Sequence, residues 1–275
     1  MLPQQAIMVK EKIRRIDTHA HVYAASCAIA PGARYRPAGE APVEAWLALQ
    51  DAAGVSHGVL VQPSFLGTDN SYLLETLRAQ PQRLRATAVV DPGIPLATLR
   101  QWDTLGVRGI RLNTIGRGHP GVYAQPEWKA LFKRLADLGW HVEVHGEGAA
   151  MVALLGVLET CPARLVVDHF GRPDAKLGLA CPGVQALLRV AEKRSVYVKL
   201  SAPYRLNGGD AGAYAGFYLT RLGTERLMWG SDWPWTQHEG RHSYTQTLGW
   251  LEEWIADAAA RRVVLWDTPA ELFRF

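Results

Sequence analysis

The chain has 275 residues, of which 48% are hydrophobic and 20% charged, and its formal net charge is +4. These proportions are typical of a globular protein with a large core. The basic residues are scattered, without a run of five Lys or Arg, which argues against a nucleic-acid partner. No apolar run reaches the roughly 18 residues of a membrane span.

The three cysteines, Cys27, Cys161 and Cys181, are odd in number and lack the spacing of a metal site. We expect buried free thiols, which indicate a reducing compartment. The first fifteen residues contain basic side chains but no apolar core before a cleavage site, so they do not resemble a secretory signal. We therefore expect a cytoplasmic protein with no membrane partner.

Strand-like and helix-like patterns alternate along the whole chain. In chain order the expected strands are residues 16–22, 58–63, 84–92, 107–113, 140–145, 165–169, 196–201 and 227–232. The expected helices between and after them are residues 43–53, a helix that begins at Asn70 and Ser71, and residues 96–105, 127–138, 151–158, 183–191, 213–222 and 244–260. Eight such units are the number that a (β/α)₈ barrel needs.

The nature of the strands supports this fold. Several are near-continuous apolar runs rather than alternating ones, as expected where helices cover a parallel sheet. A doubly wound open sheet is the alternative, but no Gly-X-Gly-X-X-Gly follows an early strand and no phosphate loop is present. Because no linker interrupts the pattern, we predict a single α/β domain, a (β/α)₈ TIM barrel, over residues 1–275.

The first expected strand carries the motif Asp-X-His-X-His, formed by Asp17, His19 and His21. Side chains two residues apart in a strand point to the same face. We therefore expect all three to project together, so that the two imidazoles can share a metal ion or a polarised oxygen. The alternative is that each histidine is a hydrogen-bonded structural residue.

Polar residues recur where the other strands end, which is where barrel enzymes place their active sites. In chain order they are Ser64, Arg111 with Asn113, His145 with Glu147, His169 with Arg172, Ser201 with Tyr204 and Arg205, and Asp232. Each has a structural alternative: Arg111 could pair with Asp91 in the barrel wall, and His145 could be a hydrogen-bonding residue at the barrel mouth. Asp232 is the strongest candidate, because a lone carboxylate after an apolar strand needs a partner or a task.

Taken together, these motifs resemble the amidohydrolase superfamily. The shared features are Asp-X-His-X-His in the first strand, a histidine after the sixth and an aspartate after the eighth. Smaller signatures, among them Asp-His-Phe-Gly-Arg-Pro at residues 168–173 and Trp-Gly-Ser-Asp-Trp-Pro at residues 229–234, are similar to its lactonase branch, which includes 2-pyrone-4,6-dicarboxylate hydrolase and sugar-acid lactonases. The likeness extends over nearly the whole chain.

The resemblance implies roles for the matching residues. Asp232 would be the general base that takes a proton from water. His19, His21 and His169 would polarise the ester carbonyl and stabilise the oxyanion. The groups that would hold substrate carboxylates are Arg111, Arg172 and Arg205, with Ser64 and Tyr204 nearby.

The fourth strand departs from the wider superfamily pattern. Dinuclear members carry there a Lys, modified to a bridging carbamate, or a Glu, whereas this chain has Arg111. A cation at that point would repel a second metal, so a dinuclear centre is not expected. Two possibilities remain: no metal is required, or one Zn²⁺ is held by His19, His21, His145 and Asp232.

The resulting expectation is a hydrolase that opens a lactone ring bearing carboxylates, so that its partner is a small anionic lactone. A mononuclear-metal decarboxylase or a lactone isomerase on the same barrel is the alternative among enzymes. A catalytically silent protein that binds anions is the alternative from another class. The sequence does not identify the lactone, the oligomeric state or the pathway.

Overall fold

A computed structural model describes residues 14–116 and 120–275, and all eight expected strands are present in it. They pair in parallel, in the consecutive order β1 to β8. Their bounds are β1 Ile16–Ala20, β2 His57–Val61, β3 Leu84–Ala88, β4 Val107–Asn113, β5 His141–His145, β6 Arg164–Val167, β7 Val196–Leu200 and β8 Leu227–Trp229. Most of the N-terminal segment judged not to be a secretory signal lies outside the described residues.

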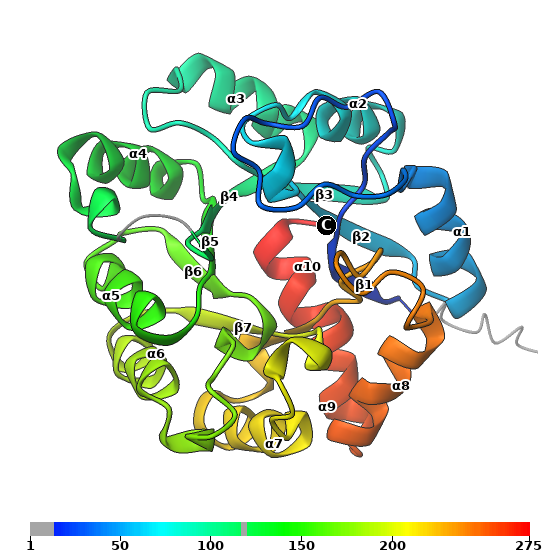
Figure 1. Cartoon of the computed structure of the whole chain (residues 1–275), viewed down its shortest axis with the longest axis vertical. Coiled ribbons are helices and arrows are strands. Elements are labelled where there is room, and N and C mark those ends of the chain that lie inside the picture. Colours follow the sequence, from blue (N-terminus) through cyan, green and yellow to red (C-terminus); the bar gives the residue numbers. More distant parts are fainter. Residues whose placement is uncertain (1–13, 117–119) are drawn as a thin grey trace, which may run out of the picture.

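The last strand returns to the first. The residues that follow β8 continue alongside β1, where the Asp232 amide donates to the His19 carbonyl at 2.8 Å and the His21 amide to the Trp233 carbonyl at 2.7 Å. The consecutive strand order and this contact confirm the predicted (β/α)₈ barrel and exclude the doubly wound sheet (Figure 1).

Helices surround the sheet (Figure 1). Their bounds are α1 Val43–Ala53, α2 Ser71–Ala79, α3 Leu96–Leu105, α4 Pro126–Asp137, α5 Gly148–Leu158, α6 Pro182–Lys193, α7 Ala211–Leu222, α8 Tyr244–Trp254, α9 Ala258–Arg262 and α10 Thr268–Phe273. Short helical turns join some of them: η1 Ser64–Leu66, η2 Pro120–Ala124, η3 His169–Gly171, η4 Gly178–Ala180, η5 Pro203–Leu206, η6 Thr224–Arg226 and η7 Val263–Asp267. Helix α3 and strand β4 have the predicted bounds.

The prediction of one closing helix over residues 244–260 is wrong. Helix α8 ends at Trp254, because Ile255 is extended and the Asp257 side chain accepts from the amides of Ala259 and Ala260 to begin α9. An Asp in this position is a strong helix start. The chain then continues through η7 to α10.

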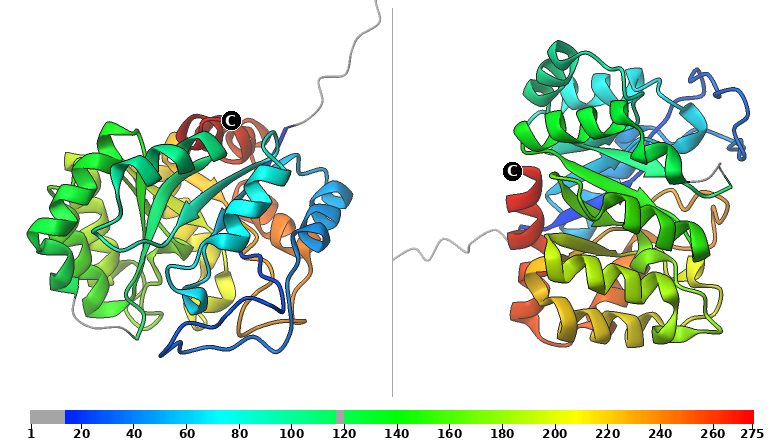
Figure 2. Two further views of the ribbon diagram at one scale, coloured as in Figure 1. Left: turned by 90° about the horizontal axis from the view of Figure 1, so that it is seen from above. Right: turned by 90° about the vertical axis from the view of Figure 1, so that its left-hand side faces the viewer.

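Helix α10 closes one end of the barrel. Leu272 and Phe273 are fully buried against apolar side chains from the strands, including Ile16 and Met228. The carbonyl of Phe273 also accepts from Nε of Arg108 near the start of β4. Figure 2 shows α10 at the end of the barrel opposite the long loop that follows β1. A site must therefore lie at the other end, where the strands finish.

The expectation that Asp17 projects beside His19 and His21 is also wrong. The pairing register of β1 with β2 shifts between Asp17 and Ala20, which interrupts the alternation of side chains. The fully buried Asp17 carboxylate instead accepts from Trp46 of α1 at 3.1 Å and Tyr244 of α8 at 2.9 Å. Asp17 thus joins the strand to the helix layer, and the histidines alone face the site.

Other expectations concern the cysteines and the membrane. All three cysteines are free; Cys161 and Cys181 are buried, whereas Cys27 is only partly buried. Among the described residues, no helix combines the length and apolar character needed to cross a bilayer.

We predict that Phe273→Ala destabilises the barrel by about 3–5 kcal/mol, because it leaves a cavity in a fully packed apolar cluster. The midpoint of guanidinium denaturation measures the effect. Val122→Ala is the control, because Val122 is 50% exposed and its truncation should change the free energy of unfolding by less than about 0.5 kcal/mol. Equal midpoints for the two variants would show that α10 does not hold the barrel together.

Candidate active site

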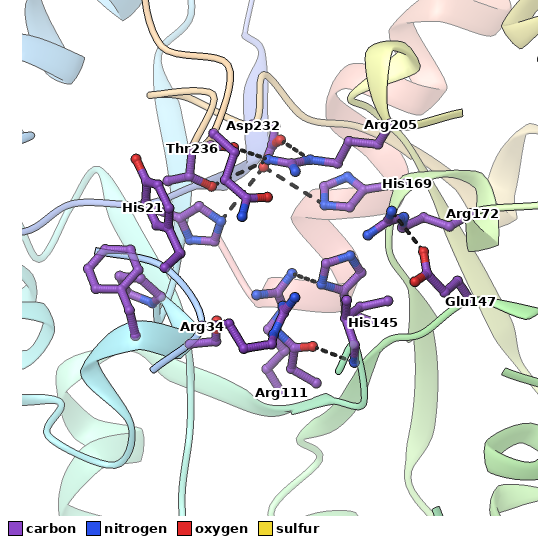
Figure 3. A pocket seen from close by; sticks show the side chains of 17 residues that line it. His21, Arg34, Arg111, His145, Glu147, His169, Arg172, Arg205, Asp232 and Thr236 are labelled. Carbon is purple, nitrogen blue, oxygen red and sulfur yellow. Dashed lines mark hydrogen bonds and ion pairs between the residues drawn. The ribbon is translucent and has the colours of Figure 1, made fainter. Parts of the chain in front are cut away.

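A cavity of about 250 Å³ lies at the end of the barrel where the strands finish. Figure 3 shows Asp232, His21 and His169 on one side of it and Arg111 and His145 on the other. Its lining residues are His21, Arg34, Tyr35, Pro63, Ser64, Phe65, Arg111, Asn113, Ile115, His145, Glu147, His169, Arg172, Arg205, Asp232, Thr236 and Gln237. Most of the predicted site residues are therefore brought together around one space.

The two carboxylate oxygens of Asp232 have different surroundings. Oδ2 accepts from the Tyr204 hydroxyl at 2.6 Å and from Nε of Arg205 at 2.9 Å. Burial opposes ionisation, but the charge of Arg205 and the nearby imidazoles outweigh it and hold the pKa of Asp232 well below its ordinary value. Asp232 is therefore an anion at neutral pH.

The other oxygen, Oδ1, faces three imidazoles and accepts no hydrogen bond from any described residue. The Nε2 atoms of His19, His21 and His169 lie 3.6, 3.7 and 3.8 Å from it. These distances are too long for hydrogen bonds. The arrangement leaves one carboxylate oxygen and several imidazole nitrogens directed at a common point.

His21 is fixed in one protonation state. Its Nδ1 lies 2.7 Å from the Val61 carbonyl, which can only accept, so Nδ1 carries the proton. Burial, followed by the charges of His19 and Arg111, lowers the pKa of His21 to about 3. At neutral pH the ring is therefore uncharged, and its Nε2 presents a lone pair toward Asp232.

Arg111 is paired with Asp168. Its Nε and Nη2 donate to Asp168 Oδ2 at 2.9 and 2.8 Å, and Nη2 also donates to Nδ1 of His145 at 3.1 Å. The alternative partner Asp91 is exposed and does not take part. Because Nδ1 of His145 accepts, its proton lies on Nε2, which is buried without a partner in the ranges 14–116 and 120–275.

A second ion pair lies deeper in the barrel. Nζ of the fully buried Lys199 donates to Oε2 of Glu143 at 2.5 Å and lies 3.2 Å from Nδ1 of His19. Asp168 Oδ1, which accepts no hydrogen bond within the described part of the chain, lies 3.3 Å from the same nitrogen.

Local backbone geometry presents these side chains. Asp232 and His169 both have left-handed backbones, with φ of 57° and 50°. Such conformations cost about 1–3 kcal/mol each in residues other than glycine and are concentrated at functional sites. Gly230 is required next to them, because a Cβ there would lie 2.6 Å from Cβ of His19.

The remaining predicted residues occupy different places. Arg172 lines the cavity and pairs with Glu147 at 2.8 Å. Ser64 lines it from η1, the turn after β2. Tyr204, predicted to bind substrate, directs its hydroxyl to Asp232 and does not line the cavity.

Two groups of described residues could hold an ion. The ligand atoms of His19, His169 and Asp232 lie within 4.8 Å of one another, as do those of His19, Glu143 and Asp168. The second group is already neutralised by Lys199 and Arg111. The predicted ligand set with His145 stays a prediction, and His145 Nδ1 is occupied by Arg111.

Comparison with known proteins agrees with this geometry. The amidohydrolase family model matches residues 16–275. The chain belongs to the amidohydrolase family. This confirms the family membership predicted from the motifs. The similar proteins described next indicate the branch of the family that this chain resembles.

One curated relative and two solved structures are especially similar to this amidohydrolase. The 2-pyrone-4,6-dicarboxylate hydrolase of Comamonas testosteroni is 29% identical, over 94% of this chain and 89% of the relative. A barrel from Acinetobacter baumannii, named a probable 2-pyrone-4,6-dicarboxylic acid hydrolase and solved with citric acid bound, is 34% identical; its TM-score is 0.89, over 95% and 99% of the two chains. A barrel from Pseudomonas putida with a similar provisional name is 41% identical; its TM-score is 0.88, over 95% and 98%.

Sequence reasoning missed the buried charges beneath the site. Glu143 and Lys199 each lie inside a strand between apolar neighbours, in His-Val-Glu-Val-His and Val-Tyr-Val-Lys-Leu. A charged residue at an inward position of a buried strand needs a partner. This pattern could have identified the pair, whereas no sequence signal placed Arg34 at the cavity.

The lowered pKa of His21 predicts how stability depends on pH. Between pH 6.5 and about 3 the unfolded chain binds a proton at this ring that the folded amidohydrolase does not. Stability should therefore fall as pH falls through this range, by about 1.4 kcal/mol per pH unit for this group. Denaturation midpoints at pH 7, 6, 5 and 4 measure the slope.

The variant His21→Asn isolates this contribution, because its amide can still donate to Val61 but does not titrate. We expect a shallower slope in the variant, although burial also lowers the pKa of His145 and His169. Parallel slopes in the two proteins would contradict the assignment of a neutral His21.

Proposed function

We propose that this amidohydrolase opens the ring of a carboxylated lactone by adding water to its ester carbonyl. One observation carries the proposal. The ionised Asp232 at the wall of the cavity has a carboxylate oxygen that faces several imidazoles and accepts no hydrogen bond from the described residues. The names of the similar proteins, which specify a pyrone dicarboxylate, support a lactone as the substrate.

The attacking water bridges Asp232 and His21 from the cavity side. Oδ1 of Asp232 and Nε2 of His21 are both acceptors and lie 3.7 Å apart, so one water molecule can donate a hydrogen to each. This gives His21 the task of orienting water, in place of the predicted task of polarising the carbonyl. Asp232 then takes a proton as the water oxygen bonds to the carbonyl carbon.

The carbonyl oxygen requires hydrogen-bond donors. His145 lines the cavity and carries a proton on a buried Nε2 that has no partner among the described residues. His19, predicted to act on the carbonyl as well, is fully buried and does not line the cavity. Preorganised donors of this kind typically contribute about 10²–10³ in rate each. His169, whose Nδ1 lies 2.8 Å from the Ser201 hydroxyl, completes the polar wall.

The charge of the substrate makes Asp232 a better base. With its pKa held low by Arg205, the carboxylate alone has little affinity for a proton. A carboxylated substrate brings negative charge into the cavity, and a like charge nearby raises the pKa of an acid. The same charge is attracted by the guanidinium groups of Arg111, Arg172 and Arg205.

The candidate ion site is suited to a metal in geometry but not in charge. On tetrahedral zinc, ligand atoms lie roughly 3.3–3.5 Å apart, and the 3.6–3.8 Å distances around Oδ1 come near this. However, each carboxylate of the two candidate groups already has a cation: Glu143 has Lys199, Asp168 has Arg111 and Asp232 has Arg205. A divalent ion would leave two buried charges uncompensated. We infer that the reaction requires no metal.

We predict that Asp232→Asn lowers kcat by about 10²–10⁴-fold, because the amide cannot take the proton from water. Ring opening of 2-pyrone-4,6-dicarboxylate, followed by the loss of its ultraviolet absorbance, measures kcat. The dissociation constant for the same compound should change by only a few fold. Asp91→Asn is the control, since Asp91 is exposed in the loop after β3. Turnover by Asp232→Asn at the wild-type rate would refute the assignment of Asp232 as the base. If the wild type binds lactones but opens none, the alternative of an anion-binding protein is correct.

Metal removal provides a separate prediction. Because the buried charges are already balanced, activity should persist after dialysis against a chelator, and added Zn²⁺ should raise it less than about twofold. Metal content is measured by mass spectrometry on the same samples. Loss of activity that Zn²⁺ restores would instead assign His19, His169 and Asp232 as metal ligands and favour the decarboxylase alternative.

A further inference from the structure

Four guanidinium groups line the cavity, and three of them are already paired. Arg111 is bound to Asp168, Arg172 to Glu147 and Arg205 to Asp232. The fourth, Arg34, has no hydrogen bond or ion pair to any part of the chain that the structure describes. Figure 3 shows its side chain at the cavity, on the same side as Arg111.

Arg34 is held at the cavity by its surroundings. It belongs to the long loop between β1 and α1, and the Ala30 amide in this loop donates to the Phe65 carbonyl at 2.8 Å. The neighbouring Tyr35 hydroxyl donates to Glu239 in the loop that follows β8. The methylene groups of Arg34 lie over Gly116, where an added Cβ would be 2.5 Å from Cδ. The loop therefore presents the exposed guanidinium at a defined place.

The positive charges around the cavity are not balanced. Four guanidinium groups line it, and three carboxylates pair with them, on Asp168, Glu147 and Asp232, which leaves the charge of Arg34 without a partner among the described residues. Burial lowers the pKa of Arg172, and the nearby charges of Arg205 and Arg34 lower it further despite Glu147. Like charges that converge on one space are unfavourable without an anion between them.

We propose that Arg34 binds an anionic group of the substrate that lies away from the reacting carbonyl, a carboxylate in a lactone dicarboxylate. This assignment rests on the proposed function and extends it: Arg111, Arg172 and Arg205 each already have a protein carboxylate as ion-pair partner, whereas the charge of Arg34 has none among the described residues. Arg34 is then the residue that distinguishes a doubly charged lactone from a singly charged or neutral one. A guanidinium suits this task because its fork matches a carboxylate.

Kinetics of Arg34→Met tests the assignment. For 2-pyrone-4,6-dicarboxylate we expect KM to rise about 10- to 100-fold with kcat changed less than about threefold, as for the loss of a hydrogen bond to a charged group. For an uncharged lactone that the wild type opens, KM should stay the same. Arg34→Lys should fall between wild type and Met, since the charge remains without the fork.

Arg36→Met is the matched control, because Arg36 is exposed in the same loop but does not line the cavity. It should leave both KM values unchanged. A KM that rises equally for charged and uncharged lactones, or that does not rise for the dicarboxylate, would overturn the role of Arg34.

Citrate binding separates this inference from the proposed function. Titration calorimetry with citrate needs no turnover, and Arg34→Met should weaken citrate binding about tenfold or more at low salt, with a smaller difference at 1 M salt. If the wild type opens no lactone but citrate binding depends on Arg34, the hydrolase proposal fails and the role of Arg34 in binding anions stands. Equal citrate affinity in wild type and Arg34→Met would refute the role of Arg34 in binding anions.

Discussion

The site depends on charge matching inside the barrel. Three buried carboxylates, on Glu143, Asp168 and Asp232, are each matched by a cation from another strand or the loop after it. An unpaired buried charge costs several kcal/mol, so removing one member of a pair leaves its partner strongly unfavourable. The pairs therefore fix one another, and through them they fix the imidazoles that face the cavity. The same ion pairs therefore stabilise the fold and hold the side chains that face the cavity in place.

The sequence was sufficient for the fold and for the positions of most site residues. Alternation of apolar strands and amphipathic helices determines the barrel, and the barrel directs the residues after its strands into one cavity. His21, Arg111, His169 and Asp232 line the cavity for this reason. Asp17 does not, because its carboxylate accepts from Trp46 and Tyr244 in the helix layer, and local alternation does not report such contacts.

Contacts between distant residues account for most of what the sequence could not predict. The break between α8 and α9 follows from a helix start at Asp257 within an otherwise helical pattern. The partner of Arg111 is a residue 57 positions away rather than the nearby Asp91. Arg34 lies in a Pro- and Gly-rich loop whose path is set by contacts with η1 and with the loop after β8, so only the folded chain shows that it reaches the cavity.

The two histidines of the first motif differ in what their inner nitrogens meet. Nδ1 of His21 faces a carbonyl and must donate, which leaves a lone pair on Nε2 at the cavity. Nδ1 of His19 lies 3.2 Å from the ammonium of Lys199 and 3.3 Å from a carboxylate oxygen of Asp168, so this ring is held by the buried charges of the barrel. A single short strand thus supplies one ring that belongs to the cavity wall and one that joins the wall to the ion pairs beneath it, because the strand crosses from the barrel interior to its mouth.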